Sequence, residues 1–247
     1  MSRFLSDWVK QAPTYTMARA LYYTARAEWP SFSLRRRRKS DSRTIASYLA
    51  GAASPRLQIG SGINGLDGWL NTDYFPQSDD LIHLDATAPF PFADNTFDLI
   101  FSEHVIEHVP LEGGVNMIEE AFRTLKPGGR LRISTPPFEF LLKAYTNPQV
   151  PLNKKYLDWH LETYNADSPA RDPLVLVNDY IRMWGHVFIY DEALLKKLFQ
   201  RAGFVDLQSF DINQSDDPRL TNLEHDGRMP DGLLKLSTMT IEGIKPV

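Results

Sequence analysis

The chain has 247 residues, of which 23% are charged, and it contains no cysteine. The lack of cysteine excludes a disulfide scaffold, a thiolate nucleophile and a cysteine-ligated zinc or iron–sulfur centre. The net charge of −4 is unevenly distributed, because residues 1–45 hold ten basic and three acidic residues and thus carry +7, which leaves −11 for the rest. This acidic body disfavours a nucleic-acid partner, since DNA-binding domains present basic faces.

The location of the chain is expected to be cytoplasmic. No uncharged run approaches the roughly 18–20 residues that span a bilayer. Near the start of the chain, Asp7 and Lys10 interrupt any apolar segment of the kind found in a secretion signal.

The first part of the chain, residues 1–45, is predicted to be a basic helical extension of a main domain at residues 46–247. Apolar residues at helical spacing predict one or two amphipathic helices within residues 1–30. The run from Arg35 to Lys39 is interpreted as a linker, with a short helix from Arg43 to Leu49 after it. This basic run is a candidate contact for an anionic membrane or a phosphorylated carrier, and a merely solvated linker is the alternative.

The main domain begins with alternating strands and helices. Apolar segments predict five strands, at residues 56–59, 69–73, 81–85, 96–102 and 130–134. A helix is predicted over Val115–Leu125, and Lys126-Pro127-Gly128-Gly129 is expected to end it through a left-handed glycine cap. Strands separated by helices predict an α/β fold with an open parallel sheet, whose ligands bind beyond the carboxyl ends of the strands.

The second half breaks this alternation. Residues 136–190 are rich in Pro, Tyr and Trp and are predicted to form a helical insertion. A helix over Tyr190–Gly203 follows, ended by Gly203. Residues 205–212 and 234–241 are predicted to form two last strands, as a terminal antiparallel pair.

The first chemical signal is the glycine turn Gly60-Ser61-Gly62-Ile63-Asn64-Gly65 after the first strand. Glycine lets the backbone turn tightly and approach a ligand without a Cβ clash. This is formally the dinucleotide pattern, but Asp73 follows too soon for a regular crossover helix, and dinucleotides need a helix N-terminus for their pyrophosphate. The turn therefore favours a ligand without phosphate. The alternative function is that of a nicotinamide-dependent oxidoreductase. The pattern is also compatible with an ordinary strand-to-loop turn that binds no ligand.

Two acids follow the next two strands. Asp73 ends the second strand and Asp85 the third. One carboxylate can accept both vicinal hydroxyls of a ribose, and another can accept an exocyclic amine, so together they describe an adenosine site. Acids after strands are also common turn residues, which is the alternative interpretation.

These motifs resemble the class I S-adenosylmethionine-dependent methyltransferases. The resemblance rests on Leu57–Gly62, on Asp73 and Asp85, on Pro89–His108 and on Leu125–Leu131. Within this class, the short Gly68–Asp73 connection (Gly-Trp-Leu-Asn-Thr-Asp) is most similar to a bacterial type 11-like branch. The resemblance implies a doubly wound, Rossmann-like, seven-stranded and mostly parallel sheet, and S-adenosylmethionine as the methyl donor.

The resemblance also implies roles for single residues at the strand ends. Seven are expected to bind the cofactor: Gly60, Ser61 and Gly62 at the methionyl part, Asp73 at the ribose, Asp85 and Ala86 at the adenine, and Ser102 at the methyl end. Glu103 is expected beside Ser102 at the methyl end. The connection from Gly65 to Asp73 departs from the common pattern, because the usual first helix does not fit there.

The catalytic candidates are His104, Glu103 and His108. If the segment is helical, His104, Glu107 and His108 share one face, and histidine titrates near neutral pH, so a general base is expected there. The alternative is that His108 packs the start of the helix and that Glu107 is a solvated acid. Two histidines and a carboxylate, with His186 as a further ligand, also fit a metal ion, but the same stretch occurs without metal in much of the family, and no metal is predicted.

The acceptor is expected to be a hydroxyl of a small molecule or a glycan, bound against the helical insertion. The insertion is rich in residues that line aromatic pockets: Tyr145, Tyr156, Trp159, His160, Tyr164, Tyr180, Trp184 and His186. The alternative for most of them is the core of a small helical cap. A non-catalytic protein that binds the cofactor or docks on a membrane is a further alternative for the whole chain.

Overall fold

The computed structural model describes residues 31–78 and 80–247. The chain divides into two compact units, Met1–Arg43 and Thr44–Val247. Helix α3 runs without interruption over Ser31–Gly51. The interpretation of residues 35–39 as a linker was therefore wrong, because no glycine or proline interrupts the helix before its last residue. The helices predicted within residues 1–30 lie outside the described residues, and the proposed extension of residues 1–45 stays a prediction.

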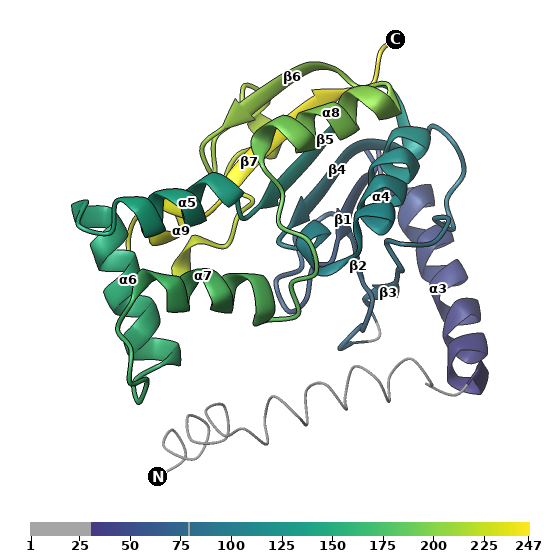
Figure 1. Cartoon of the computed structure of the whole chain (residues 1–247). Coiled ribbons are helices and arrows are strands. Elements are labelled where there is room, and N and C mark those ends of the chain that lie inside the picture. Colours follow the sequence, from purple (N-terminus) through teal and green to yellow (C-terminus); the bar gives the residue numbers. More distant parts are fainter. Residues whose placement is uncertain (1–30, 79) are drawn as a thin grey trace. The chain divides into compact units, whose positions relative to one another are not determined.

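The second unit is built on a seven-stranded sheet with the strand order β3-β2-β1-β4-β5-β7-β6 (Figure 1). Strand β7 runs antiparallel to both β5 and β6, and the pairs among β1 to β5 are parallel. The doubly wound α/β class and the terminal antiparallel pair are thus confirmed. The strands are β1 (Arg56–Ile59), β2 (Leu70–Asp73), β3 (Ile82–His83), β4 (Phe97–Glu103), β5 (Leu125–Thr135), β6 (Val205–Phe210) and β7 (Met239–Ile244).

Helices α4 (Leu111–Thr124) and α8 (Glu192–Ala202) pack on one face of the sheet (Figure 1). Asp191 caps the start of α8 and Gly203 ends it in the left-handed conformation, as predicted. The predicted glycine end of α4 was wrong: α4 ends where Leu125 takes an extended backbone, and Leu125 already belongs to β5. The sheet pairing of Leu125 with Phe97 thus ends the helix before any glycine is reached.

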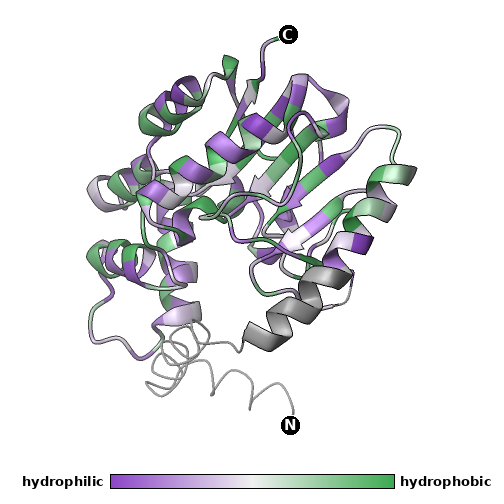
Figure 2. Ribbon diagram, turned by 90° about the vertical axis from the view of Figure 1, so that its right-hand side faces the viewer, coloured by the Kyte–Doolittle hydropathy of each residue, from purple (hydrophilic) through white to green (hydrophobic). Residues whose placement is uncertain are grey.

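Strand β4 alternates between two hydrophobic clusters, as the two-residue period of a strand requires. Ile100 faces the main core with α4 and α8, whereas Leu99 and Phe101 face Trp69 and Leu220 on the other side. Figure 2 shows hydrophobic residues in bands along the strands, while the helices alternate hydrophilic and hydrophobic residues. The sheet is therefore covered on both faces, and its strand ends are left to carry polar groups.

The predicted helical insertion is confirmed as α5 (Phe138–Thr146), α6 (Pro151–Tyr164) and α7 (Pro173–Arg182). A short helix, α9 (Leu233–Leu236), lies against α6 and completes a separate hydrophobic cluster (Figure 1). The start of the last predicted strand at Leu234 was wrong, since residues 233–236 are helical and the strand begins at Met239. Buried Leu233 explains this, because it packs in the insertion and not on the sheet.

Short 3₁₀ turns complete the second unit: η1 (Ile106–His108), η2 (Pro218–Leu220) and η3 (Asp226–Arg228). Among the helices of residues 31–78 and 80–247, none combines the length and the apolar character needed to cross a membrane.

Candidate active site

The glycine turn after β1 has the backbone shape that the sequence predicts. Gly60 and Gly62 both take positive φ angles, of 69° and 54°. A Cβ on Gly60 would lie 2.2 Å from Cγ2 of Val105, so this position has no room for a side chain. Residues 60–69, all of them described, form turns and no helix, which confirms that the usual first helix does not fit.

Asp73 is the anchor of this turn. Its Oδ2 accepts a hydrogen bond from the amide of Gly62 at 3.0 Å, and its Oδ1 accepts one from the amide of Phe75 at 2.7 Å. The carboxylate is half-buried at the end of β2. Each carboxylate oxygen has a further lone pair, so Asp73 can accept ligand hydroxyls while it holds the turn.

Asp85 lies two residues beyond β3, which pairs with β2 through Asp73 and His83. Its Oδ1 accepts hydrogen bonds from the amide and the hydroxyl of Thr87, at 2.9 and 2.7 Å. Asp85 is thus a turn residue, as the alternative interpretation had it, and it also lies on the same edge of the sheet as Asp73. The next residue, Ala86, is buried, and its carbonyl accepts a hydrogen bond from Asn116 of α4.

Two buried hydroxyls lie at this edge without a hydrogen-bond partner among the described residues. They belong to Ser61 and Ser102, which are 4% and 0% exposed. Ser102 pairs in register with Ile59, the residue before the glycine turn. An unsatisfied buried hydroxyl is costly, and a bound ligand with polar groups would remove the cost. These hydroxyls, the two glycines and Asp73 fit the nucleoside and amino-acid groups of S-adenosylmethionine.

Glu103 is turned toward the C-terminal part of the chain. Its carboxylate forms an ion pair with Arg228 at 2.8 Å and accepts hydrogen bonds from the amide of His225 at 3.2 and 3.3 Å. These contacts hold η3 against the end of β4. The position gives Glu103 a structural contact, and its predicted catalytic role stays a prediction.

The partly buried His104 and the buried Glu107 form a polar pair next to the end of β4. Nδ1 of His104 lies 3.1 Å from Oε1 of Glu107, and Nε2 of His104 lies 3.1 Å from the Thr238 hydroxyl. The hydroxyl of Thr135 donates to Oε2 of Glu107 at 2.9 Å. His104 has a φ of 52°, a conformation uncommon for a residue other than glycine, and its amide donates to the carbonyl of Ser134.

Glu107 is fully buried, so the alternative interpretation of a solvated acid was wrong. Burial raises the pKa of the Glu107 carboxyl, but the contact with His104 and the positive charges of His104 and His108 outweigh this effect and hold that pKa at about 2. The carboxylate is therefore charged at neutral pH.

His186 joins this group from the far end of the insertion. Its ring centroid lies 5.0 Å from that of His108, and the candidate ligand atoms of Glu107, His108 and His186 all lie within 4.8 Å of one another. The amides of Val187 and Phe188 donate to the backbone carbonyl of Glu107, at 2.7 and 3.2 Å. His186 was predicted from the sequence as a metal ligand or a pocket residue. Thr135 and Thr238 were not predicted, because the sequence offers no signal for them.

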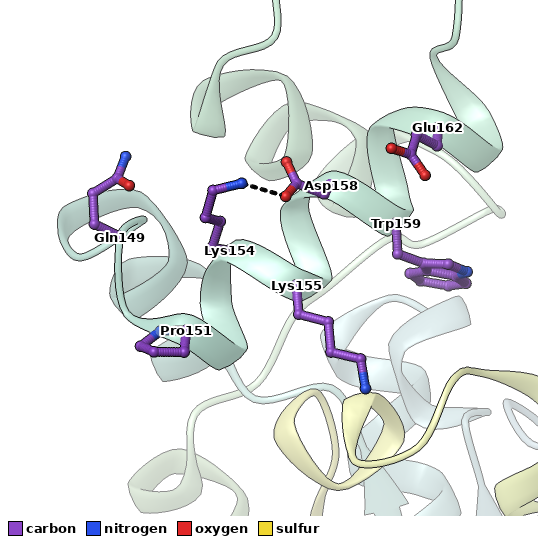
Figure 3. A pocket seen from close by; sticks show the side chains of 7 residues that line it. All are labelled: Gln149, Pro151, Lys154, Lys155, Asp158, Trp159 and Glu162. Atoms are coloured by element: carbon purple, nitrogen blue, oxygen red, sulfur yellow. Dashed lines mark hydrogen bonds and ion pairs between the residues drawn. The ribbon is translucent and has the colours of Figure 1, made fainter.

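Most aromatic residues of the insertion pack against one another. Tyr156 and Tyr180 are buried and their hydroxyls lie 3.1 Å apart, whereas Tyr145 is half exposed. Trp159 contributes to a hollow on the surface of α6, where Lys154 forms an ion pair with Asp158 (Figure 3). The hollow is lined by Gln149, Pro151, Lys154, Lys155, Asp158, Trp159 and Glu162. None of the predicted cofactor or catalytic residues lines it, so it is separate from the strand ends.

Residues 65–133 match the family model of the methyltransferase domain. This region contains Asp73, Asp85 and the segment from Ser102 to His108. Residues 65–133 are thus similar to a methyltransferase domain, in agreement with the resemblance to the class I enzymes that use S-adenosylmethionine.

One curated relative is 2-methoxy-6-polyprenyl-1,4-benzoquinol methylase, mitochondrial, of Danio rerio, which is 26% identical over 133 residues. That alignment covers 49% of this chain and 34% of the relative, so the matched part spans about a third of the relative's length.

Solved structures are also similar. One is a SAM dependent methyltransferase from Archaeoglobus fulgidus, with 13% identity over 85% of this chain and 94% of that chain and a TM-score of 0.46. Another is a complex between the Haloferax volcanii Trm112 methyltransferase activator and a methyltransferase, with 16% identity over 86% and 94% of the two chains and a TM-score of 0.44.

Proposed function

We propose that this chain transfers the methyl group of S-adenosylmethionine to a hydroxyl oxygen of a small molecule or a glycan. The observation that carries the proposal is the shared edge of the sheet. Asp73 and the Gly60 turn offer a nucleoside site there, and the polar pair of His104 and Glu107 follows the neighbouring strand β4. Binding both reactants at one edge supplies the proximity that a direct transfer needs.

The sulfonium of the cofactor supplies a methyl group that needs no covalent enzyme intermediate, in keeping with a chain without cysteine. As the new oxygen–methyl bond forms and the sulfur–methyl bond breaks, the hydroxyl proton has to leave the oxygen. We assign this proton to Nε2 of His104, because Nδ1 of the same ring faces the Glu107 carboxylate, which orients it. Glu103 then acts as a positioning residue through Arg228, and not on the reacting atoms.

The cofactor part of the proposal is tested by calorimetric titration of the full chain with S-adenosylhomocysteine and, separately, with NAD. We expect binding of the first and none of the second. Binding of NAD without binding of S-adenosylhomocysteine would favour a nicotinamide-dependent oxidoreductase. Binding of S-adenosylhomocysteine without any methyl transfer would favour the non-catalytic alternative.

The acceptor part is tested by incubating the full chain with cell extract and S-adenosylmethionine that carries an isotopically labelled methyl group. Mass spectrometry then identifies the compound that gains the label, and its fragment ions show which atom carries the methyl group. We expect an oxygen-linked methyl group. A methyl group on a ring carbon, which the name of the Danio rerio relative suggests for that protein, would contradict the hydroxyl acceptor and leave the cofactor assignment intact.

A further inference from the structure

We propose that Glu107, His108 and His186 form a binding site for a divalent transition-metal ion. Their candidate ligand atoms lie within 4.8 Å of one another, and two imidazole nitrogens with one carboxylate oxygen make a donor set that suits manganese, iron, cobalt or zinc. This proposal departs from the sequence prediction of no metal, because the sequence alone did not place His186 beside the 3₁₀ turn η1.

The Glu107 carboxylate supports the site independently of the histidine geometry. It is fully buried, its Oε2 accepts the Thr135 hydroxyl, and its Oε1 has no hydrogen bond among the described residues. Nδ1 of His104 lies 3.1 Å from Oε1, and the second lone pair of this oxygen remains for a further partner. A fully buried carboxylate is costly to keep charged, and a cation in direct contact would reduce that cost.

His186 is oriented as a metal ligand. Its Nδ1 lies 2.6 Å from the carbonyl oxygen of Tyr180. A carbonyl only accepts, so Nδ1 carries the proton and Nε2 keeps its lone pair for an ion. A carbonyl that accepts the proton of the other ring nitrogen fixes both the tautomer and the ring orientation of a histidine that binds a metal.

The backbone fixes the distance between η1, which carries Glu107 and His108, and the segment that carries His186. His108 follows Glu107 in η1, while His186 belongs to the segment between α7 and α8. Hydrogen bonds from the amides of Val187 and Phe188 to the Glu107 carbonyl tie this segment to η1. The site is therefore held by the same backbone hydrogen bonds that tie the segment before α8 to η1.

Three protein ligands leave coordination positions open for an acceptor. A metal ion can hold a hydroxyl oxygen there and stabilise the negative charge that develops as the proton leaves. This role rests on the proposed function, because it presumes a hydroxyl acceptor. The binding of the ion does not, because it depends only on the side chains of Glu107, His108 and His186.

The test is metal binding by the full chain after removal of bound ions with a chelator. Titration with Co²⁺, followed by its visible absorption, is expected to show one saturable ion per chain, which Mn²⁺ or Zn²⁺ displaces. Mg²⁺, which prefers oxygen ligands, is expected to compete poorly. The variants H108Q and H186Q should each weaken Co²⁺ binding by at least about tenfold. Even the loss of a residue that only hydrogen-bonds to a metal ligand costs about 10- to 100-fold in metal affinity.

The control variant is H225Q. His225 is exposed and contacts Glu103 through its backbone amide, so replacing its side chain should leave the affinity for Co²⁺ unchanged. Circular dichroism checks that each variant folds. Absence of saturable Co²⁺ binding in the folded parent chain would overturn the proposal, as would equal losses in H186Q and H225Q. Neither result would affect the titration with S-adenosylhomocysteine, so the two proposals fail separately.

Discussion

Two neighbouring parts of the shared edge of the sheet are held together in different ways. They are named the cofactor edge and the acceptor edge after the roles proposed for them. The cofactor edge comprises the Gly60 turn, Asp73 and Asp85, and its hydrogen bonds join residues close in sequence: Gly62 and Asp73 are 11 residues apart, and Asp85 and Thr87 are two apart.

The acceptor edge comprises Glu103, His104, Glu107, His108 and the segments that close over them. Its contacts join residues far apart: His104 and Thr238 are separated by 134 residues, and Glu103 and Arg228 by 125. The cofactor edge is thus a local structure, whereas the acceptor edge exists only once the insertion and the C-terminal strand have folded onto the sheet. Substitutions at the cofactor edge should therefore weaken cofactor binding, whereas substitutions at the acceptor edge should lower turnover.

The largest expected effect is on turnover. The variant H104Q should lower kcat by about 10²–10⁴-fold, the usual contribution of a positioned acid or base. The affinity for S-adenosylhomocysteine should change little, because His104 lies on the acceptor edge. Steady-state kinetics with the identified acceptor and calorimetry measure the two quantities. An equal loss in both would show that the two edges are not separable.

The second effect is on stability and compares the two glycines of the turn. G60A should be destabilised by roughly 2–5 kcal/mol, since a Cβ there meets Val105 and the left-handed backbone adds strain. G62A should lose only about 1–2 kcal/mol, because its Cβ would meet no atom within 4 Å and the strain acts alone. Urea unfolding measures both.

The double variant G60A/V105A serves as the control for this pair. It removes the side chain that the new Cβ would meet, so it should be less destabilised than the sum of the two single substitutions. Strict additivity would mean that the contact with Val105 is not what requires glycine at position 60.

The third effect is on cofactor affinity. D73A should weaken the binding of S-adenosylhomocysteine by about 1.5–3 kcal/mol, or roughly 10- to 150-fold, the range for hydrogen bonds to a charged group. D73N keeps an oxygen that can accept the Phe75 amide and should lose less. Calorimetry on both variants gives the dissociation constants. An unchanged dissociation constant in D73A would show that the ribose lies elsewhere.

The same contrast explains how much the sequence could predict. The glycine turn, the two acids and strands β1 to β4 follow from local patterns, because a strand end and a tight turn are encoded within about ten residues. Even the missing first helix could be predicted, from the short spacing between Gly65 and Asp73. The end of α4 was predicted at the wrong residue, because the pairing of Leu125 with Phe97 overrides the glycine cap that the sequence offers.

The acceptor edge could be predicted only in part. His104 and His108 stood out because they share a helical face with Glu107 and because histidine titrates near neutral pH, but nothing in the sequence places Thr135 or Thr238 beside them. Glu107 looked like a solvated acid, and only the packing of η1 against the insertion makes it a buried one. Contacts of this kind depend on how distant segments meet, which single residues and local spacing do not encode.

A smaller effect concerns pH and the insertion that supports the acceptor edge. His160 is buried, its Nε2 lies 2.8 Å from the Asp179 carboxylate of α7, and Tyr164 and Trp184 pack around its ring. Burial lowers the pKa of His160 below its usual 6.5, although Asp179 opposes the shift. The unfolded chain therefore takes up the proton at a higher pH than the folded chain, and folding stability should fall as the pH drops below about 6.5.

The variant H160Q isolates this contribution. The glutamine amide can donate to Asp179 and does not titrate, so the free energy of unfolding should depend less on pH between 7 and 5 than it does in the parent chain. Urea unfolding at several pH values provides the comparison. If the free energy of unfolding changed equally with pH in H160Q and in the parent chain, His160 would have the same pKa in the folded and the unfolded chain.

The smallest effect is expected from the ion pair between Glu103 and Arg228. Because Glu103 is 9% exposed and Arg228 29%, the coupling should be near the upper end of the 0–1 kcal/mol found for exposed pairs. A double-mutant cycle with E103Q and R228M measures this coupling from urea unfolding. If Glu103 positions η3 and does not act on the reacting atoms, E103Q and R228M should lower kcat by similar, few-fold amounts. A loss of kcat in E103Q that approaches that of H104Q, with R228M near normal, would instead make Glu103 a catalytic residue and extend the acceptor edge back into β4.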